Sequence, residues 1–184
     1  NSLEWITANN IGKVLFSSSS ECYAATTEIF NYPIPTSEEV PLTISEIGHP
    51  RYTYAVTKIL GESAFLTYGK QYKFPVTIVR YQNIFGPRMG FKHVIPHLVQ
   101  RFCDDLESPF KIYGADQTRA FCYISDAAEG TVLALENASS DQEIYHMGSP
   151  VEITIEELTK TVGILMGYKG EYFPAPTYPG SVSR

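Results

Sequence analysis

The chain has 184 residues, 43% of them hydrophobic, and this is enough for a soluble domain with a core of its own. Its formal net charge is −6, so the sequence lacks the basic surface that binding to nucleic acid or an anionic membrane would require. No apolar run of about 18 residues predicts a membrane span, and three cysteines without metal-ligand spacing predict a reduced, cytoplasmic protein with no metal site.

The first third of the chain begins with a predicted helix end and a buried strand. Residues 3–8 have the pattern of a helix that ends at the turn 9–12, and residues 13–17 predict a parallel strand. Because there is neither an initiator Met nor a signal peptide, we expect the sequence to begin inside a domain. Residues 24–53 contain four prolines and little periodicity, which predicts a long loop of the kind that usually carries function.

The rest of the chain alternates between helical and strand-like patterns. Strands are predicted over residues 75–81, 110–113, 120–124 and 143–147. Helices are predicted over residues 54–68 and 94–106, over residues 126–137 behind a cap at Ser125–Asp126, and after a capping box at residues 154–157. This alternation indicates a parallel sheet covered on both faces. Its ligands are expected at the carboxyl ends of the strands, where Ser17–Ser20 and Tyr81–Asn83 lie.

A tyrosine and a lysine on the predicted helix 54–68 have the spacing of an acid–base pair. Tyr54 and Lys58 are four residues apart and therefore share one helix face. A free tyrosine has a pKa of about 10, and a nearby ammonium favours its phenolate. Tyr54 could then act as a general base toward a substrate hydroxyl and as the acid in reverse. The competing interpretation is a half-buried tyrosine beside a solvated lysine, a pairing that occurs by chance in many helices.

Four motifs share the order and spacing of a known family: Ser17–Ala24, Tyr54–Glu62, Arg80–Arg88 and Tyr113–Asp126. In combination they resemble the extended short-chain dehydrogenase/reductase family, which includes NAD-dependent nucleotide-sugar epimerases and dehydratases. The departures are Cys22 for Val, Ala24 for Gly, Phe85 for Tyr, and a turn after Gly114 that is one residue shorter.

The resemblance implies an α/β fold: the C-terminal part of a Rossmann-like parallel sheet with a small mixed α/β substrate-binding domain. Residues 1–88 would be a partial NAD-binding domain. Residues 89–184 would be mainly substrate-binding, with some segments returning to the Rossmann sheet. The glycine fingerprint Gly-x-x-Gly-x-x-Gly is absent from the sequence. We therefore expect these residues alone to bind NAD poorly, because that loop and the helix behind it hold the pyrophosphate.

By the same resemblance, Ser19, Tyr54 and Lys58 form the catalytic triad, and Ser20 and Glu21 belong to the catalytic region. NAD is the implied cofactor, and its expected contacts are Ser17, Tyr54, Lys58 and Tyr81. In this scheme Lys58 holds the cofactor ribose, and the hydroxyl of Ser19 binds the same substrate oxygen as Tyr54.

A nucleotide-diphosphate sugar is the implied partner. Its expected contacts are Asn83, His93, Val94, Lys111, Tyr113, Arg119 and Arg184. In the competing interpretation, Asn83 only fixes its loop and Arg119 only forms a surface ion pair. The resemblance also implies a homodimer through the tyrosine-bearing helix, and we expect Ala55, Leu66 and Tyr68 to form a second apolar face there.

Residues 19–21 bear on the type of reaction. The 4,6-dehydratases of the family have Asp-Glu directly after a catalytic Thr, and the uronic acid decarboxylases resemble Ser/Thr-Ser-Glu there. Ser19-Ser20-Glu21 therefore favours a decarboxylase or 4-epimerase over a dehydratase. Two alternatives are a truncated protein that binds a nucleotide sugar without catalysis and a short-chain reductase acting on a non-sugar substrate.

Overall fold

The computed structural model describes residues 2–106 and 109–177, and it divides into two compact units. The described part of the first unit is residues 2–82 and 124–148. The second unit is formed by residues 83–106, 109–123 and 149–177. The chain therefore leaves the first unit after its second strand, returns to it over residues 124–148, and leaves again.

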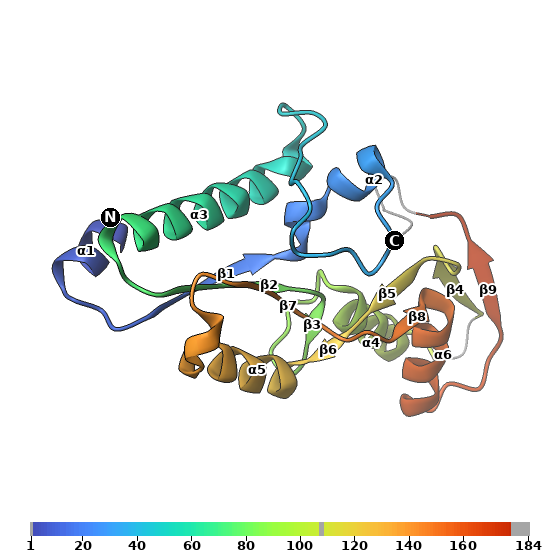
Figure 1. Cartoon of the computed structure of the whole chain (residues 1–184). Coiled ribbons are helices and arrows are strands. Elements are labelled where there is room, and N and C mark those ends of the chain that lie inside the picture. The colour runs from blue at the N-terminus through green and yellow to red at the C-terminus, as the bar shows by residue number, and fades with distance from the viewer. Residues whose placement is uncertain (1, 107–108, 178–184) are drawn as a thin grey trace. The chain divides into compact units, whose positions relative to one another are not determined.

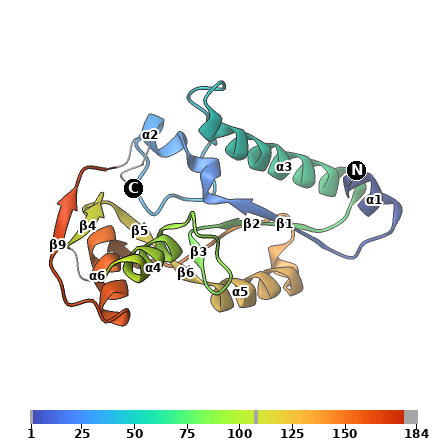
Figure 2. The same cartoon turned by 180° about the vertical axis from the view of Figure 1, so that it is seen from behind.

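The first unit is built on a parallel three-stranded sheet in the order β1-β2-β7. Its strands are β1 (Val14–Ser19), β2 (Val76–Tyr81) and β7 (Ile144–Met147). Its helical segments are α1 (Ser2–Ala8), η1 (Ser20–Tyr23), α2 (Thr26–Phe30), α3 (Pro50–Tyr72), α5 (Ile124–Glu136) and η2 (Ala138–Ser140). Helix α3 covers one face of the sheet and α5 the other (Figures 1 and 2). The first five residues of β2 are buried accordingly, as expected of a central parallel strand.

Close packing of α3 on β1 depends on a glycine in the helix. A Cβ placed on Gly61 would lie 2.2 Å from Cζ of Phe16, so any larger residue would force the Phe16 ring or the helix to shift. The Phe16 ring stacks on Phe65 with 4.8 Å between the ring centroids. The residues that end the strands are in register, with Ser19 opposite Tyr81 and Tyr81 opposite Met147. The packing therefore places α3 against the strand that ends in the serine cluster.

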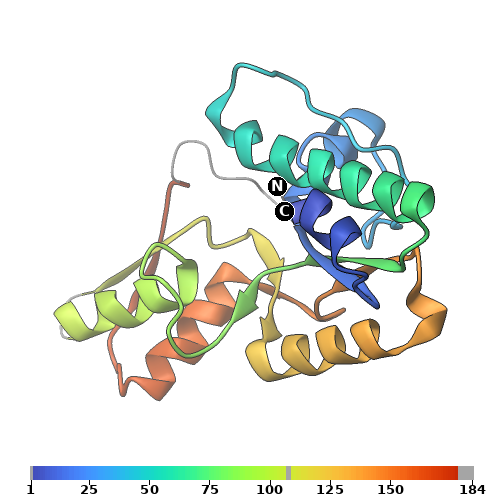
Figure 3. The ribbon, with the colours of Figure 1, turned by 90° about the vertical axis from the view of Figure 1, so that its left-hand side faces the viewer.

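The second unit combines three short strand pairs with two helices. β3 (Ile84–Phe85) pairs with β6 (Cys122–Tyr123) and β4 (Phe110–Tyr113) with β9 (Tyr172–Ala175) in parallel, whereas β5 (Thr118–Ala120) and β8 (Glu152–Thr154) are antiparallel. Helices α4 (Val94–Asp104) and α6 (Ile155–Leu165) lie side by side in Figure 3. Phe102 and Phe110 stack with centroids 3.9 Å apart at the centre of its core.

The α/β fold predicted from the sequence is confirmed by this architecture. The capping box is also confirmed, because the Thr154 side chain accepts from the Glu157 amide and the Glu157 carboxylate accepts from the Thr154 amide. The long loop predicted over residues 24–53 is wrong in part. It contains α2, and α3 already begins at Pro50, since proline fits the first turn of a helix. The cap predicted at Ser125–Asp126 is wrong, because α5 begins one residue earlier, at Ile124.

Candidate functional site

The first candidate region is the carboxyl edge of the sheet in the first unit, where Ser19 ends β1. Ser19 has an extended backbone, and its hydroxyl accepts from the amide of Glu21 at 3.2 Å, which makes it the cap of η1. The Glu21 side chain is exposed. The serine hydroxyl thus caps the turn that follows β1, and Ser20 and Glu21 are the first two residues of the short helix η1.

Tyr54 and Lys58 lie together on α3, beside the end of β1. The ammonium nitrogen of Lys58 is 5.5 Å from the Tyr54 ring centroid and 5.4 Å from that of Phe16. It donates a hydrogen bond of 2.7 Å to the backbone carbonyl of Ser17. Tyr54 is 51% exposed. The structure therefore brings the predicted tyrosine–lysine pair next to the serine strand, with the phenol open to a ligand.

Tyr81 ends β2 and turns its hydroxyl toward α5. The hydroxyl lies 2.6 Å from that of Thr131, and Thr131 is itself 2.6 Å from the Ala127 carbonyl to which it donates. Because the Thr131 proton is used there, Tyr81 is the donor of the first bond. The contact expected between Tyr81 and the cofactor stays a prediction.

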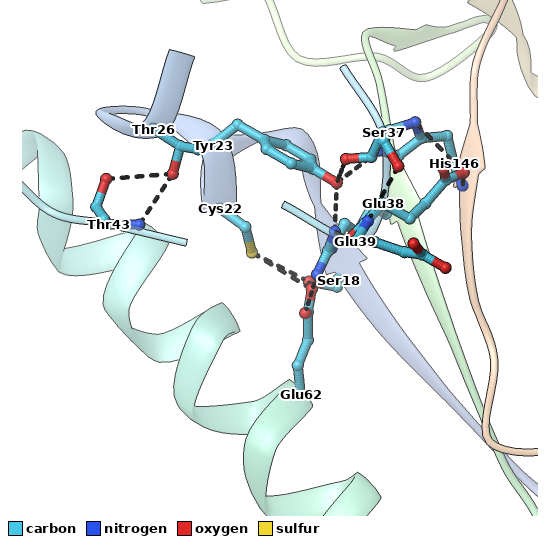
Figure 4. Close-up of polar contacts among 11 residues, drawn as sticks. Ser18, Cys22, Tyr23, Thr26, Ser37, Glu38, Glu39, Thr43, Glu62 and His146 are labelled. Atoms are coloured by element: carbon cyan, nitrogen blue, oxygen red, sulfur yellow. Dashed lines mark hydrogen bonds and ion pairs between the residues drawn. The ribbon is translucent and has the colours of Figure 1, made fainter. Parts of the chain in front are cut away.

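A buried polar cluster, which no sequence argument had assigned a role, lies between α3, β1 and β2. Glu62 of α3 is 4% exposed and Arg80 of β2 is 2% exposed. They form a two-pronged ion pair, with Nε to Oε1 at 2.9 Å and Nη2 to Oε2 at 2.6 Å. The hydroxyl of Ser18 also donates to Oε1 of Glu62, and the Cys22 thiol lies 3.5 Å from the same oxygen. Figure 4 shows Glu62 pointing at Ser18 and Cys22.

Arg80 also holds the segment that follows η1. Its Nη1 donates to the hydroxyl of Tyr23 and, at 3.0 Å, to the backbone carbonyl of Glu38. The Tyr23 hydroxyl is 2.8 Å from Nε2 of His146 and 3.3 Å from the carbonyl of Ser37. The Glu38 carboxylate accepts from the amide of His146 at 3.1 Å (Figure 4). These contacts tie residues 37–38 to the ends of β2 and β7.

The charges in this cluster are set by the pairing. Burial acts to raise the pKa of Glu62, but hydrogen bonds from Arg80 and Ser18 outweigh it and hold this pKa below its ordinary value. Burial acts to lower the pKa of Arg80, but its bonds to Glu62 keep that pKa raised. Burial raises the pKa of Cys22, and the Glu62 charge adds to the rise. The cluster is therefore an ionised pair beside a neutral thiol.

The second candidate region is a pocket of about 290 Å³ that lies wholly within the second unit. Three cationic side chains line it: Lys92, Arg101 and Arg119. The Arg101 guanidinium is held in place, since its carbon lies 4.1 Å from the Phe110 ring centroid and its Nη2 donates to the carbonyl of Lys111 at 2.6 Å. A pocket of this size with several cations suits a phosphorylated ligand.

The pocket includes four of the residues expected to bind substrate: Asn83, Val94, Tyr113 and Arg119. Asn83 has a left-handed backbone with φ of 39°, and its side-chain amide donates to the Ala120 carbonyl at 3.0 Å, so it also fixes its loop. His93 precedes α4 and Lys111 has an exposed side chain, and neither lines the pocket. Arg184 lies outside the described residues.

Sequence reasoning missed His97, Arg101 and Gln117, which also line this pocket. A signal was present for each of them. Val94, His97 and Arg101 follow one another at helical spacing and therefore share one face of α4. Gln117 and Arg119 alternate along an extended segment and point the same way.

No cluster of three or more metal-ligating side chains occurs in the part of the chain that the structure describes. Within residues 2–106 and 109–177, no helix has the length and apolar character that crossing a membrane requires.

Comparison with known proteins relates these features to one family. The "NAD dependent epimerase/dehydratase family" matches residues 1–148. A UDP-N-acetyl-alpha-D-glucosaminuronate decarboxylase of Bacillus cytotoxicus is 37% identical over 156 residues, which are 82% of this chain and 45% of that protein. A dTDP-D-glucose 4,6-dehydratase of Homo sapiens is 35% identical over 114 residues, which are 60% of this chain and 31% of that protein.

A related crystal structure is that of a UDP-glucuronic acid 4-epimerase from Bacillus cereus, in complex with UDP-glucuronic acid and NAD. Its identity to this chain is 26% and its TM-score is 0.72, with 98% of this chain and 54% of that one covered. The chain thus spans about half the length of these relatives or less. By name, the three relatives carry out three different reactions.

Proposed function

Because the chain belongs to the NAD dependent epimerase/dehydratase family, we propose that it carries the catalytic residues of an enzyme that modifies a nucleotide-diphosphate sugar through transient oxidation at C4. The observation that carries this proposal is the position of Tyr54 and Lys58. Their side chains meet on one face of α3, and Lys58 donates to the carbonyl of Ser17 at the end of β1. The exposed phenol is thereby available to a substrate hydroxyl.

The residues of this edge fit the reactive end of NAD. The ammonium of Lys58 is placed to donate to ribose hydroxyls as well as to Ser17, and the phenol of Tyr54 is exposed beside it. Nothing among the 184 residues has the glycine pattern that would hold the pyrophosphate, so the fit concerns the nicotinamide ribose alone. When bound there, NAD supplies the hydride acceptor and later the hydride donor.

The chain's own residues would then move the proton. Tyr54 removes it from the C4 hydroxyl as the hydride leaves and returns it when the sugar is reduced. Lys58 lies one helical turn away, with its ammonium nitrogen 5.5 Å from the Tyr54 ring centroid. Ser19, whose hydroxyl oxygen already accepts from the Glu21 amide, retains its proton to donate to the same sugar oxygen.

The pocket in the second unit is proposed to bind the nucleotide diphosphate. Arg101, Arg119 and Lys92 supply the positive charge, and arginine forks match the geometry of phosphate oxygens. Tyr113 and Phe121 supply aromatic surface for the base. His93, Lys111 and Arg184 stay in the proposal as substrate contacts that rest on the family resemblance.

Among the reactions of the family, we favour uronic acid decarboxylation or 4-epimerisation. Ser20 and Glu21 follow Ser19 directly, and the exposed Glu21 carboxylate is available to handle a proton or to orient a water. A 4,6-dehydratase is the alternative within the family. A protein that binds the nucleotide sugar without catalysis is the alternative outside it.

We further propose a cytoplasmic homodimer that contacts neither membrane nor nucleic acid. The apolar face expected from Ala55, Leu66 and Tyr68 does not support it, because Ala55 is buried and the other two pack on the core of their own unit. Apart from Tyr54, the exposed large hydrophobic residues of α3 are Leu60 and Tyr72, at 66% and 51%. They are the side chains that a partner helix would cover.

Mass spectrometry of the product separates the candidate reactions. The native full-length polypeptide is incubated with UDP-glucuronate and, separately, with UDP-glucose. Loss of about 44 mass units, which is one CO₂, indicates decarboxylation, and an isomer of unchanged mass indicates epimerisation. Loss of about 18 mass units, which is one water, indicates the dehydratase. Binding of both nucleotide sugars without any product would contradict the enzymatic proposal.

A further inference from the structure

We propose that the buried Glu62–Arg80 ion pair is a positioning pair: it fixes α3 against β1 and β2, so that Tyr54 and Lys58 are held beside the end of the serine strand. The inference rests on the proposed function for the roles of Tyr54 and Lys58. The position of the helix is a property of the structure in its own right.

The members of the cluster are neighbours in sequence of the proposed catalytic residues. Ser18 precedes Ser19, Arg80 precedes Tyr81, and Glu62 lies one helical turn after Lys58. Side chains alternate across a strand, so Ser18 and Arg80 point to the opposite side from Ser19 and Tyr81. The cluster therefore lies on the α3 side of the sheet, one residue along the strands from Ser19 and Tyr81 and one helical turn from Lys58.

A single carboxylate joins four segments in this cluster. The Glu62 oxygens on α3 accept from Arg80 on β2 and from Ser18 on β1, and Oε1 lies 3.5 Å from the Cys22 thiol of η1. The two-pronged bond to Arg80 has one good geometry, so it restrains both the rotation of α3 and its sliding along the sheet. Apolar contacts such as Phe16 with Phe65 restrain distance but tolerate sliding.

Stability alone is a weak explanation for this pair. A buried ion pair loses the hydration of both charges, and well-packed apolar residues of similar size are often at least as stable. What an apolar pair does not reproduce is the fixed direction of the bonds. Arg80 adjoins Tyr81 in sequence and Glu62 lies one helical turn from Lys58, so the pair fits a role in holding α3 in position against β1 and β2.

The test removes both charges together, because either charge alone would be left buried and unpaired. In the native full-length polypeptide, the double variant Glu62→Met/Arg80→Met keeps the side-chain volume and loses the directed bonds. We expect kcat on the nucleotide sugar to fall between about 10- and 100-fold, the scale of a misplacement of roughly 1 Å, with KM within about twofold of wild type. A role in stability alone would lower the thermal midpoint and leave kcat unchanged.

A matched control comes from the other end of the same strand. Lys13, which precedes β1, forms an ion pair of 2.7 Å with Asp141. The variant Lys13→Met/Asp141→Met removes this pair far along the strand from Ser19, and its kcat should stay within about twofold of wild type. Ser18→Ala is the milder test should the first double variant not fold. It removes one donor to Glu62, leaves both charges paired and should lower kcat by about fivefold.

Amide hydrogen exchange over residues 50–62 gives a second readout that does not depend on substrate. Faster exchange there in the Glu62/Arg80 variant, with the Lys13/Asp141 variant unchanged, supports the positioning role. A folded Glu62/Arg80 variant with wild-type kcat and wild-type exchange overturns it. If the wild-type protein converts no nucleotide sugar, the proposed function fails, and exchange alone then decides the positioning role.

Discussion

The two candidate regions hold their polar groups in opposite ways. At the sheet edge of the first unit, the exposed Tyr54 and the buried, ionised pair Glu62–Arg80 belong to the same packed helix and strands. Glu62 and Arg80 are only 4% and 2% exposed. In the pocket of the second unit, the cations Lys92, Arg101 and Arg119 line the cavity itself. The first arrangement suits chemistry, which depends on position. The second suits recognition of an anion, which depends on charge and reach.

Removal of the Tyr54 hydroxyl is the sharpest test of this contrast. Tyr54→Phe keeps the ring beside Lys58 and removes the acid–base group, so turnover should fall by at least about 100-fold. The affinity for the nucleotide sugar should stay nearly the same, because the proposed diphosphate contacts belong to the other unit. Steady-state kinetics and calorimetry measure the two quantities. Unchanged turnover would remove Tyr54 from the proposed mechanism.

The buried pair should respond to the loss of one partner more than to the loss of both. Arg80→Met alone leaves the Glu62 carboxylate buried and unpaired, and we expect it to lower the free energy of unfolding by about 3–5 kcal/mol. The double variant Glu62→Met/Arg80→Met should lose clearly less. Denaturant titration compares them. Lys160→Met is the control, since its pair with Glu156 is about half exposed and should change the free energy by less than about 1 kcal/mol.

The sequence predicts the Tyr54–Lys58 pair but not the Glu62–Arg80 pair, and the reason is physical. Tyr54 and Lys58 meet because they lie four apart on one helix, a relation that the sequence contains. Glu62 and Arg80 meet only through the packing of α3 on β2, which no local pattern specifies. The Tyr54–Glu62 motif includes the glutamate, yet nothing in its spacing indicates a buried partner.

Whether a strand was predicted from the sequence depends on its length. Those of the first unit are long enough for their apolar runs to be recognised, and β2 and β7 lie where they were predicted. β3 and β8 of the second unit have two and three residues, too few for a period to show. Arg101 was missed for a different reason, because its face of α4 is periodic but reads equally well as ordinary solvent-facing surface.

Loss of a cation from the pocket should weaken binding of the nucleotide sugar, whereas Tyr54→Phe should lower turnover. Arg101→Met keeps much of the side chain against the Phe110 ring and removes the charge. We expect KM for the nucleotide sugar to rise by about 10- to 100-fold, the worth of one or two charge-assisted hydrogen bonds, with kcat within about threefold. Lys160→Met, on the neighbouring helix, is the charge-matched control. An unchanged KM for Arg101→Met would place the diphosphate outside this pocket.

Acid should weaken the first unit before the second. Burial lowers the pKa of His146, and the pKa values of Glu62 and Glu38 are held down because hydrogen bonds and nearby charges outweigh their burial. For all three groups the unfolded chain takes up its proton at a higher pH than the folded chain does. Stability is therefore complete above the unfolded values and falls as the pH drops, below about 6.5 for His146 and below about 4.5 for the carboxylates.

A substitution at His146 separates the loss of stability that begins below about pH 6.5 from the loss that begins below about pH 4.5. Its imidazole lies 2.8 Å from the Tyr23 hydroxyl, and the charges nearest to it are Glu38, which favours protonation, and Arg80, which opposes it. His146→Gln retains a polar group toward Tyr23 and cannot titrate. The variant should lose little of its thermal midpoint between about pH 7 and pH 5, where wild type declines, and both should decline below about pH 4.5. Amide exchange read separately in the two units locates the effect, and an equal response of the second unit to His146→Gln would contradict the assignment.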